Sequence, residues 1–185
     1  ISAVSGLIRA LGLCISLSVN VALARFLSPE GFGLYGFIMA SVAILTVPAA
    51  FGMPSFIVRE TARSLTENRP IRIWKLWSWA SRVGVIASVG AIAIGIPWAL
   101  VNVEAGQLRV WAWGGALLPV LVFSYLRSAA IRGLGHTLLG QIPETLLRPT
   151  ATVIIVLIYA YFVGPQFDTE FAMIASLCGT FISFV

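Results

Sequence analysis

The sequence predicts an all-α integral membrane protein, a bundle of about six transmembrane helices. Of its 185 residues, 59% are hydrophobic and only 10% are charged, and the mean hydropathy is +0.97. A water-soluble domain carries about 25% charged residues because its surface must be hydrated. So few charges cannot cover an apolar core of this size, and we therefore expect lipid to surround most of the chain.

Six apolar segments have the length that a membrane crossing requires. A helix rises 1.5 Å per residue, so about 20 residues cross the hydrocarbon core. The segments are continuously apolar rather than alternating, which favours helices over the strands of a membrane barrel. The predicted spans are residues 7–26, 32–56, 83–103, 110–126, 137–163 and 171–185, the last of them truncated.

The two ends of the sequence predict a fragment of a longer protein. The chain begins at Ile1 rather than Met, and it stops at Val185 inside an apolar run. A second interpretation of the N-terminus is a secretory signal peptide, because Arg9 precedes an apolar run and an Ala-Leu-Ala cleavage pattern at residues 22–24. The length of that run and the spans that follow it favour a transmembrane helix.

The basic residues predict how the spans are oriented. Ten of them fall on one side of the predicted bundle and two, Arg25 and Arg109, on the other. The ten are Arg9, Arg59, Arg63, Arg69, Arg72, Lys75, Arg82, Arg127, Arg132 and Arg148. Basic residues in short loops mark the cytoplasmic face, so the N-terminus is predicted to be cytoplasmic. The net charge of +5 then suits an anionic lipid leaflet better than nucleic acid.

Residues 70–82 combine basic and aromatic side chains in one short segment. The basic residues are Arg72, Lys75 and Arg82, and the tryptophans are Trp74, Trp77 and Trp79. This pattern predicts a helix that lies in the cytoplasmic interface. An aromatic belt at the start of the third span explains the same pattern equally well.

The residue patterns of common catalytic and metal sites are absent from the sequence. The single histidine, His136, and the two cysteines, Cys14 and Cys178, lack the spacing of metal ligands. There is no GxxxxGK[ST] phosphate loop, and the glycines of residues 133–135 follow no predicted strand. We therefore expect no catalytic residues, no metal and no cofactor, and we expect that the protein is not an enzyme.

Polar side chains recur along the first span. They are Ser5, Arg9, Ser16, Ser18 and Asn20. An arginine at the centre of a membrane costs about 2.5–3.5 kcal/mol on insertion scales, so it normally faces a partner or a water-filled cavity. Serines cost less and commonly mediate helix packing. The sequence leaves open whether Arg9 faces a cavity or marks the inner end of its helix.

Residues 23–35, LARFLSPEGFGLY, resemble the first periplasmic turn of bacterial polysaccharide and oligosaccharide flippases. These flippases belong to the multidrug/oligosaccharidyl-lipid/polysaccharide exporter superfamily. Residues 51–63, FGMPSFIVRETAR, are similar to the end of its second helix, and residues 132–149, RGLGHTLLGQIPETLLRP, to its loop into the fifth helix. The three segments occur in the order and topology of the family.

The resemblance implies the N-terminal lobe of a two-lobe protein with 12–14 helices in the bacterial cytoplasmic (inner) membrane. It implies translocation of polyprenyl-diphosphate-linked oligosaccharide or polysaccharide repeat units by alternating access, as in O-antigen, lipopolysaccharide, capsule or exopolysaccharide assembly. The partners so implied are the lipid-linked oligosaccharide, membrane lipids, the C-terminal lobe of the same protein, a polysaccharide polymerase and glycosyltransferases.

The same resemblance suggests substrate-binding residues. Residues 9–12, Arg-Ala-Leu-Gly, resemble an Arg-x-Leu-Gly in the first helix of the related lipid II flippases, where the arginine lines the substrate cavity. Arg9 is therefore the first candidate, with Asn20, Arg25 and Arg59 as further candidates. An outer interfacial position for Arg25, and an orienting role for Arg59 and Arg63, are the structural alternatives.

Other functions stay open at this point. A multidrug or cation antiporter of the same superfamily would carry a carboxylate inside the membrane, and Glu144 is the one candidate in the five complete spans. We expect Glu144 at the interface beside Arg148, which favours an anionic substrate. A membrane scaffold for polysaccharide assembly is a third possibility. A membrane glycosyltransferase would have larger hydrophilic loops.

Overall fold

The computed structural model describes residues 2–50, 52–67, 70–102, 105–162, 164 and 167–184. This part of the chain forms seven α-helices and two short helical turns, without strands, which confirms the predicted all-α class. The elements are α1 (Ser2–Phe26), α2 (Pro29–Ala50), α3 (Met53–Thr66), α4 (Pro70–Asn102), η1 (Ala105–Gln107), α5 (Leu108–Gly133), η2 (Pro143–Leu147), α6 (Arg148–Phe162) and α7 (Thr169–Phe184).

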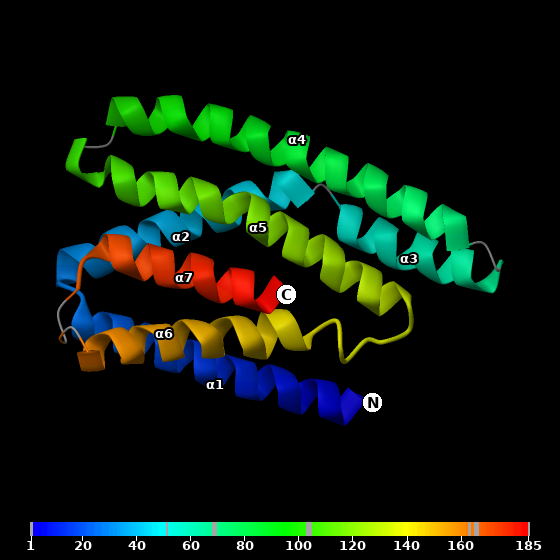
Figure 1. The fold of residues 1–185 in the computed structure, drawn as a ribbon, viewed down its shortest axis with the longest axis horizontal. Coiled ribbons are helices and arrows are strands. Elements are labelled where there is room, and N and C mark those ends of the chain that lie inside the picture. The colour runs from blue at the N-terminus through cyan, green and yellow to red at the C-terminus, as the bar shows by residue number, and fades with distance from the viewer. Residues whose placement is uncertain are drawn as a thin grey trace.

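The helices lie side by side along one axis and alternate in direction, except that α3 continues in the direction of α2 (Figure 1). α1 begins at one end of the bundle, and the α3–α4 and α5–η2 connections lie at the same end. We call this the basic end, because the helix ends that these connections join carry Arg63, Arg72 and Arg132. The α1–α2, α4–α5 and α6–α7 connections lie at the opposite end. The predicted grouping of the connections is therefore present in the structure.

α5 and α7 form the centre of the bundle. In the most apolar stretch of α5, 50% of the residues are buried, whereas in the most apolar stretch of α1 only 11% are buried. Leu117, Leu118 and Val122 of α5 are almost fully buried, and α7 packs on α5 through Met173 and its neighbours. Helices this apolar, with a packed centre and exposed outer faces, fit a bundle whose surrounding solvent is lipid.

Within the described part of the chain, five helices are long and apolar enough to cross a membrane. They are Val4–Phe26, Pro29–Pro48, Ile71–Gly95, Leu108–Gly133 and Pro143–Phe162, and Thr169–Phe184 is apolar but shorter. The predicted spans 7–26 and 110–126 lie inside α1 and α5, and the predicted span 171–185 corresponds to α7, with residue 185 outside the described residues. The chain is thus a multi-pass membrane protein.

The second predicted span, residues 32–56, is divided in the structure. α2 ends at Ala50, and α3 starts at Met53. Gly52 between them has φ 68°, a left-handed conformation that only glycine adopts without strain. Pro54 follows in the first turn of α3, where the missing N–H has no helical partner to lose. The apolar run therefore continues past the point where one helix ends and the next begins, and hydropathy alone does not reveal this boundary.

α3 is an amphipathic helix that packs against α5. Its buried residues, Met53, Ile57, Thr61 and Ser64, recur at spacings of four and three along one face. A Cβ on Gly133 of α5 would lie 2.7 Å from the Cβ of Thr61, so the two helices approach closely here. Sequence analysis assigned this segment to a span and a loop because its apolar start hides the helical periodicity.

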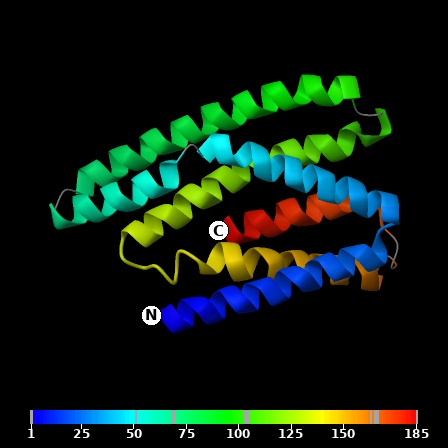
Figure 2. The ribbon, with the colours of Figure 1, turned by 180° about the vertical axis from the view of Figure 1, so that it is seen from behind.

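Residues 70–82 and the predicted span 83–103 form one continuous helix, α4, with residue 103 outside the described residues. Its 33 residues extend about 50 Å, whereas the hydrocarbon core is about 30 Å thick. α3 and the start of α4 project past the other helices at the basic end (Figures 1 and 2). Residues 70–82 are therefore the first turns of a spanning helix rather than a separate helix.

The start of the predicted span 137–163 also differs. Residues 134–142 form turns, and the helical part begins at Pro143 with a π-helical turn, η2, that leads into α6. Residue 163 lies outside the described residues. A proline at the first position of a helical segment is favourable because its N–H is not needed there.

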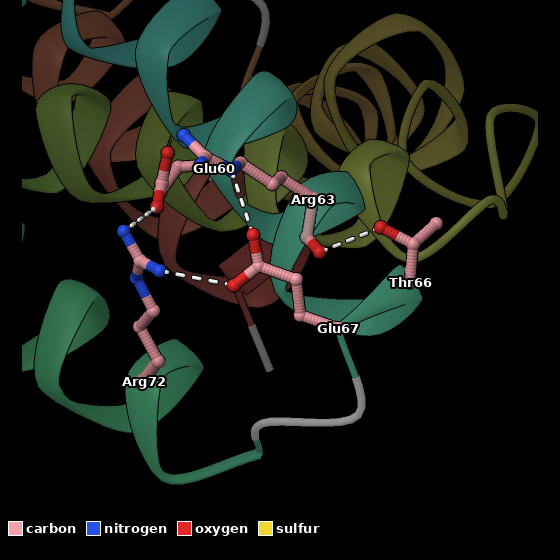
Figure 3. A network of polar contacts seen from close by, with 5 residues as sticks. All are labelled: Glu60, Arg63, Thr66, Glu67 and Arg72. Carbon is pink, nitrogen blue, oxygen red and sulfur yellow. Dashed lines mark hydrogen bonds and ion pairs between the residues drawn. The ribbon is translucent and has the colours of Figure 1, made fainter.

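Ion pairs join α3 to the start of α4 (Figure 3). Arg72 lies 2.8 Å from Glu60 and 3.1 Å from Glu67, and Arg63 lies 2.9 Å from Glu67. The hydrogen bond to Glu67 raises the pKa of Arg63 above its ordinary value. Because Arg63 and Arg72 are exposed, water and salt screen these ion pairs, and each pair adds little to stability. The network orients α3 and the start of α4, which together form a helical hairpin, rather than determining the fold.

Candidate functional site

A cavity of about 690 Å³ lies between α1 and α2, with η2, α6 and α7 forming its other walls. α1 packs mainly against α6 and η2 and contacts α2 only sparsely. This separation leaves room for the cavity. Its lining residues are Arg9, Gly12, Leu13, Ser16, Val19, Asn20, Phe32, Tyr35, Gly36, Met39, Glu144, Thr145, Arg148, Pro149, Thr152 and Ser176.

α1 presents a polar stripe to the cavity. Arg9, Ser16 and Asn20 recur at spacings of seven and four residues, which places them on one helical face. The Asn20 Nδ2 donates a hydrogen bond to the Ser16 carbonyl oxygen at 2.9 Å. Arg9 and Asn20 are both exposed to the cavity side of an otherwise apolar helix. A guanidinium group and an amide thus face a space large enough for a polar ligand.

α1 is held against η2 near the basic end of the cavity. A Cβ on Gly12 would lie 2.5 Å from the Thr145 backbone oxygen, so only glycine allows this approach. The Ser5 hydroxyl donates a hydrogen bond to Gln141 Oε1 at 2.9 Å. Small residues that let helices pack closely are typical of membrane proteins. The Gly12 contact therefore sets the width of the cavity on this side.

The π-helical turn η2 places two charged side chains in the cavity wall. Pro149 has no N–H, so the Thr145 carbonyl lacks its usual α-helical donor. The Arg148 N–H instead bonds the Pro143 carbonyl, five residues back. Glu144 and Arg148, four residues apart and so on one face of the helix, both line the cavity. Such π bulges occur often at functional sites.

Glu144 is half-buried, and three polar side chains lie around its carboxyl group. Ser128 forms a hydrogen bond with it, and Arg132 and Arg148 act on it electrostatically. Its Oε1 atom is buried and has no hydrogen-bond partner among the described residues. Sequence analysis placed Glu144 at the interface beside Arg148; the structure places it beside Arg148 in the cavity wall. The wall therefore carries two guanidinium groups and one carboxylate.

A buried hydrogen bond joins α2 to α7 at the far side of the cavity. The Tyr35 hydroxyl and the Ser176 hydroxyl are 2.9 Å apart. Ser176 already donates its only hydroxyl proton to the Ala172 carbonyl at 2.9 Å, so Tyr35 must be the donor of the bond between them.

Replacing Tyr35 with phenylalanine removes this donor and leaves the ring in place. Ser176 keeps its bond to Ala172, so no buried donor is left unsatisfied. We expect a loss of about 1 kcal/mol in the free energy of unfolding. Thermal unfolding in detergent, with Tyr161→Phe on the exposed end of α6 as the control, measures the difference. Equal effects of the two substitutions would contradict the assigned bond.

The structure brings together only some of the residues predicted as site candidates. Arg9 and Asn20 line the cavity, whereas Arg25 is exposed near the opposite end of α1 and Arg59 lies on the exposed face of α3. Arg148, absent from the predicted site, lines it. The prolines that flank Arg148 and η2 were the signal in the sequence, because paired prolines disturb a helix and redirect its side chains.

The side chains in the cavity wall can bind a polar ligand. Two arginines, an amide and hydroxyl groups can hold an anionic, hydroxyl-rich ligand through charge-assisted and neutral hydrogen bonds. Among the described residues, no three His, Cys, Asp or Glu side chains come together in a way that could hold a metal ion.

Comparison with protein families gives a match over almost the whole chain. The family model described as polysaccharide biosynthesis protein matches residues 2–184, which is almost the whole chain. Comparison with curated proteins and with solved structures gives no match. An apolar helical bundle with a polar cavity and a family match across all seven helices lead to one conclusion. The chain belongs to the polysaccharide biosynthesis protein family.

Proposed function

We propose that the protein translocates polyprenyl-diphosphate-linked oligosaccharide or polysaccharide repeat units across the bacterial cytoplasmic membrane by alternating access. The observation that supports this proposal most directly is the pair Arg9 and Arg148 in the wall of a cavity between membrane helices. Family membership supports the glycan part of the proposal. In this proposal the basic end, including the N-terminus, faces the cytoplasm.

The physical problem of such a substrate is its headgroup. A diphosphate and several sugars cannot cross hydrocarbon unaided, whereas the polyprenyl chain is as apolar as the bilayer. Guanidinium groups bind phosphate oxygens through paired donors and stay charged at every physiological pH. A cavity of about 690 Å³ falls within the range of small-molecule sites. The headgroup would enter the cavity while the tail stays in lipid.

A multidrug or cation antiporter is the second candidate, and Glu144 is the observation that favours it. A half-buried carboxylate in a membrane cavity can bind a proton or a cation. Here, however, Arg132 and Arg148 both act on Glu144, and Arg9 lines the same cavity. Their positive charge opposes a cationic ligand, so the charges favour the anionic substrate. In this proposal the protein performs no covalent chemistry and is not an enzyme.

A reconstituted flipping assay tests the proposal. The complete protein is placed in liposomes that contain a fluorescent polyprenyl-diphosphate sugar, and a membrane-impermeant quencher reports the lipid in the outer leaflet. We expect the protected half of the fluorescence to become quenchable much faster than in empty liposomes. Equal rates would contradict the proposal, and faster efflux of a cationic dye driven by a proton or sodium gradient would favour the antiporter.

A further inference from the structure

We infer that the start of α4 is a binding surface for anionic phospholipid headgroups in the leaflet at the basic end. One helical face carries the surface. Its members, here called the α4 stripe, are Ile71, Trp74, Lys75, Arg82, Val85, Ile86 and Val89. At 3.6 residues per turn these positions fall within about one third of the helix circumference, and all of them are exposed.

One part of the α4 stripe faces lipid. Val85, Ile86 and Val89 are 44%, 71% and 59% exposed, and they lie within the apolar segment Ile71–Gly95. Exposed branched aliphatic side chains on a membrane-spanning helix contact acyl chains. The same face continues toward the N-terminus of α4 through Arg82 and Lys75. The basic side chains are therefore continuous with a lipid-facing surface.

The length of α4 lets its start extend through the headgroup layer at the basic end. The helix is about 50 Å long, longer than the 40–45 Å of a bilayer including its interfaces. Lys75 and Arg82 precede the continuous apolar run that begins at Val83 and are separated from each other by about two turns. Long basic side chains at this depth extend toward phosphate groups while their aliphatic stems stay in apolar surroundings.

Exposed aromatic and aliphatic side chains flank the two charges. Trp74 is 76% exposed and Ile71 is 72% exposed. Trp79 is 51% exposed, and its ring also contacts Phe56 of α3 at 6.2 Å between centroids. Tryptophan is enriched at membrane interfaces because its ring is apolar with one polar edge. Exposure to water would be unfavourable for this group of side chains, whereas an interface accommodates it.

The acidic residues of the hairpin do not neutralise the α4 stripe. Glu60 and Glu67 form their ion pairs with Arg72 and Arg63, as Figure 3 shows. In the part of the chain that the structure describes, Lys75 and Arg82 form no ion pair. Two positive charges thus remain for an external anion. Continuity with the lipid-facing side chains identifies that anion as a phospholipid headgroup rather than an acidic soluble protein.

The test measures lipid selectivity with the complete protein. Nanodiscs of phosphatidylcholine and phosphatidylglycerol supply the lipids, and native mass spectrometry counts the lipids that the released protein retains. We expect phosphatidylglycerol to be enriched. One basic residue near an anionic surface changes binding about fivefold, so K75Q/R82Q should lower the enrichment up to about 25-fold. High salt should lower it as well.

Two matched variants and one mass measurement complete the design. R25Q/R109Q removes the same charge at the opposite end and should change the enrichment less than twofold. K75R/R82K keeps the charge and should preserve the enrichment of phosphatidylglycerol. Gel filtration verifies that every variant folds. Unchanged enrichment in K75Q/R82Q, or an equal loss in R25Q/R109Q, overturns the inference. Loss of a dimeric mass with unchanged lipid retention would instead identify the surface as a contact between copies.

Discussion

Replacing Arg9 or Arg148 with glutamine is expected to lower transport of the lipid-linked sugar at least tenfold. Each guanidinium group would donate charge-assisted hydrogen bonds to the diphosphate, worth about 1.5–3 kcal/mol. That range corresponds to a roughly 10- to 150-fold change in binding. The measurements are the initial rate in proteoliposomes and the amount of surface polymer in cells that depend on the variant, with protein level determined in parallel.

The structure supplies matched controls for these variants. Arg25 and Arg59 are exposed arginines outside the cavity lining, so Arg25→Gln and Arg59→Gln should retain transport within about twofold. Arg9→Lys keeps the charge but loses the paired donors and should give an intermediate rate. If the single variants Arg9→Gln and Arg148→Gln both retained full transport, that result would contradict the role proposed for the cavity.

The neighbouring Glu144 affects how a transport defect of the Arg148→Gln variant must be interpreted. Removing that guanidinium leaves a half-buried carboxylate with Arg132 as its remaining basic neighbour, and an uncompensated buried charge destabilises a protein. The double variant Glu144→Gln/Arg148→Gln removes both charges and avoids this penalty. A transport defect shared by the single and double variants therefore reports the loss of the guanidinium group, whereas a defect confined to the single variant reports instability.

The all-helical membrane fold could be predicted because lipid offers the backbone no hydrogen-bond partner. Each apolar run must then be a helix, and hydropathy alone finds it. The division between α2 and α3 escaped this reasoning, because residues 51–57 stay largely apolar through the break at Gly52. The sequence does contain a local signal, since a glycine two residues before a proline is a common way to end one helix and start another.

The cavity was only partly predictable from the sequence. Arg9 and Asn20 were named as candidates alongside the resemblance to flippases, and both line the cavity on one face of α1. Glu144 in the π-helical turn and Arg148 directly after it also line the cavity, because the chain folds this turn against α1. A basic residue near the end of a span also predicts topology, so the sequence could not separate the two roles of Arg148.

Replacing Gly12 with alanine is expected to destabilise the bundle by about 1–3 kcal/mol and to disturb the cavity. The new methyl group would meet the Thr145 backbone oxygen at 2.5 Å and its carbonyl carbon at 3.2 Å. Backbone atoms cannot rotate away as a flexible side chain can. α1 must therefore move away from η2, which carries Arg9 away from Arg148. Thermal unfolding in detergent and the proteoliposome rate measure the two consequences.

Gly6 provides the matched control on the same helix. A Cβ at Gly6 has no neighbouring atom within 4 Å, and alanine favours a helix over glycine by about 1 kcal/mol. Gly6→Ala should therefore keep or raise the melting temperature, while Gly12→Ala lowers both melting temperature and transport. The two variants share one chemical change in α1, so their difference isolates the contact with Thr145. If both behave alike, the close packing of α1 on η2 does not define the cavity, and the joint role of Arg9 and Arg148 loses its structural basis.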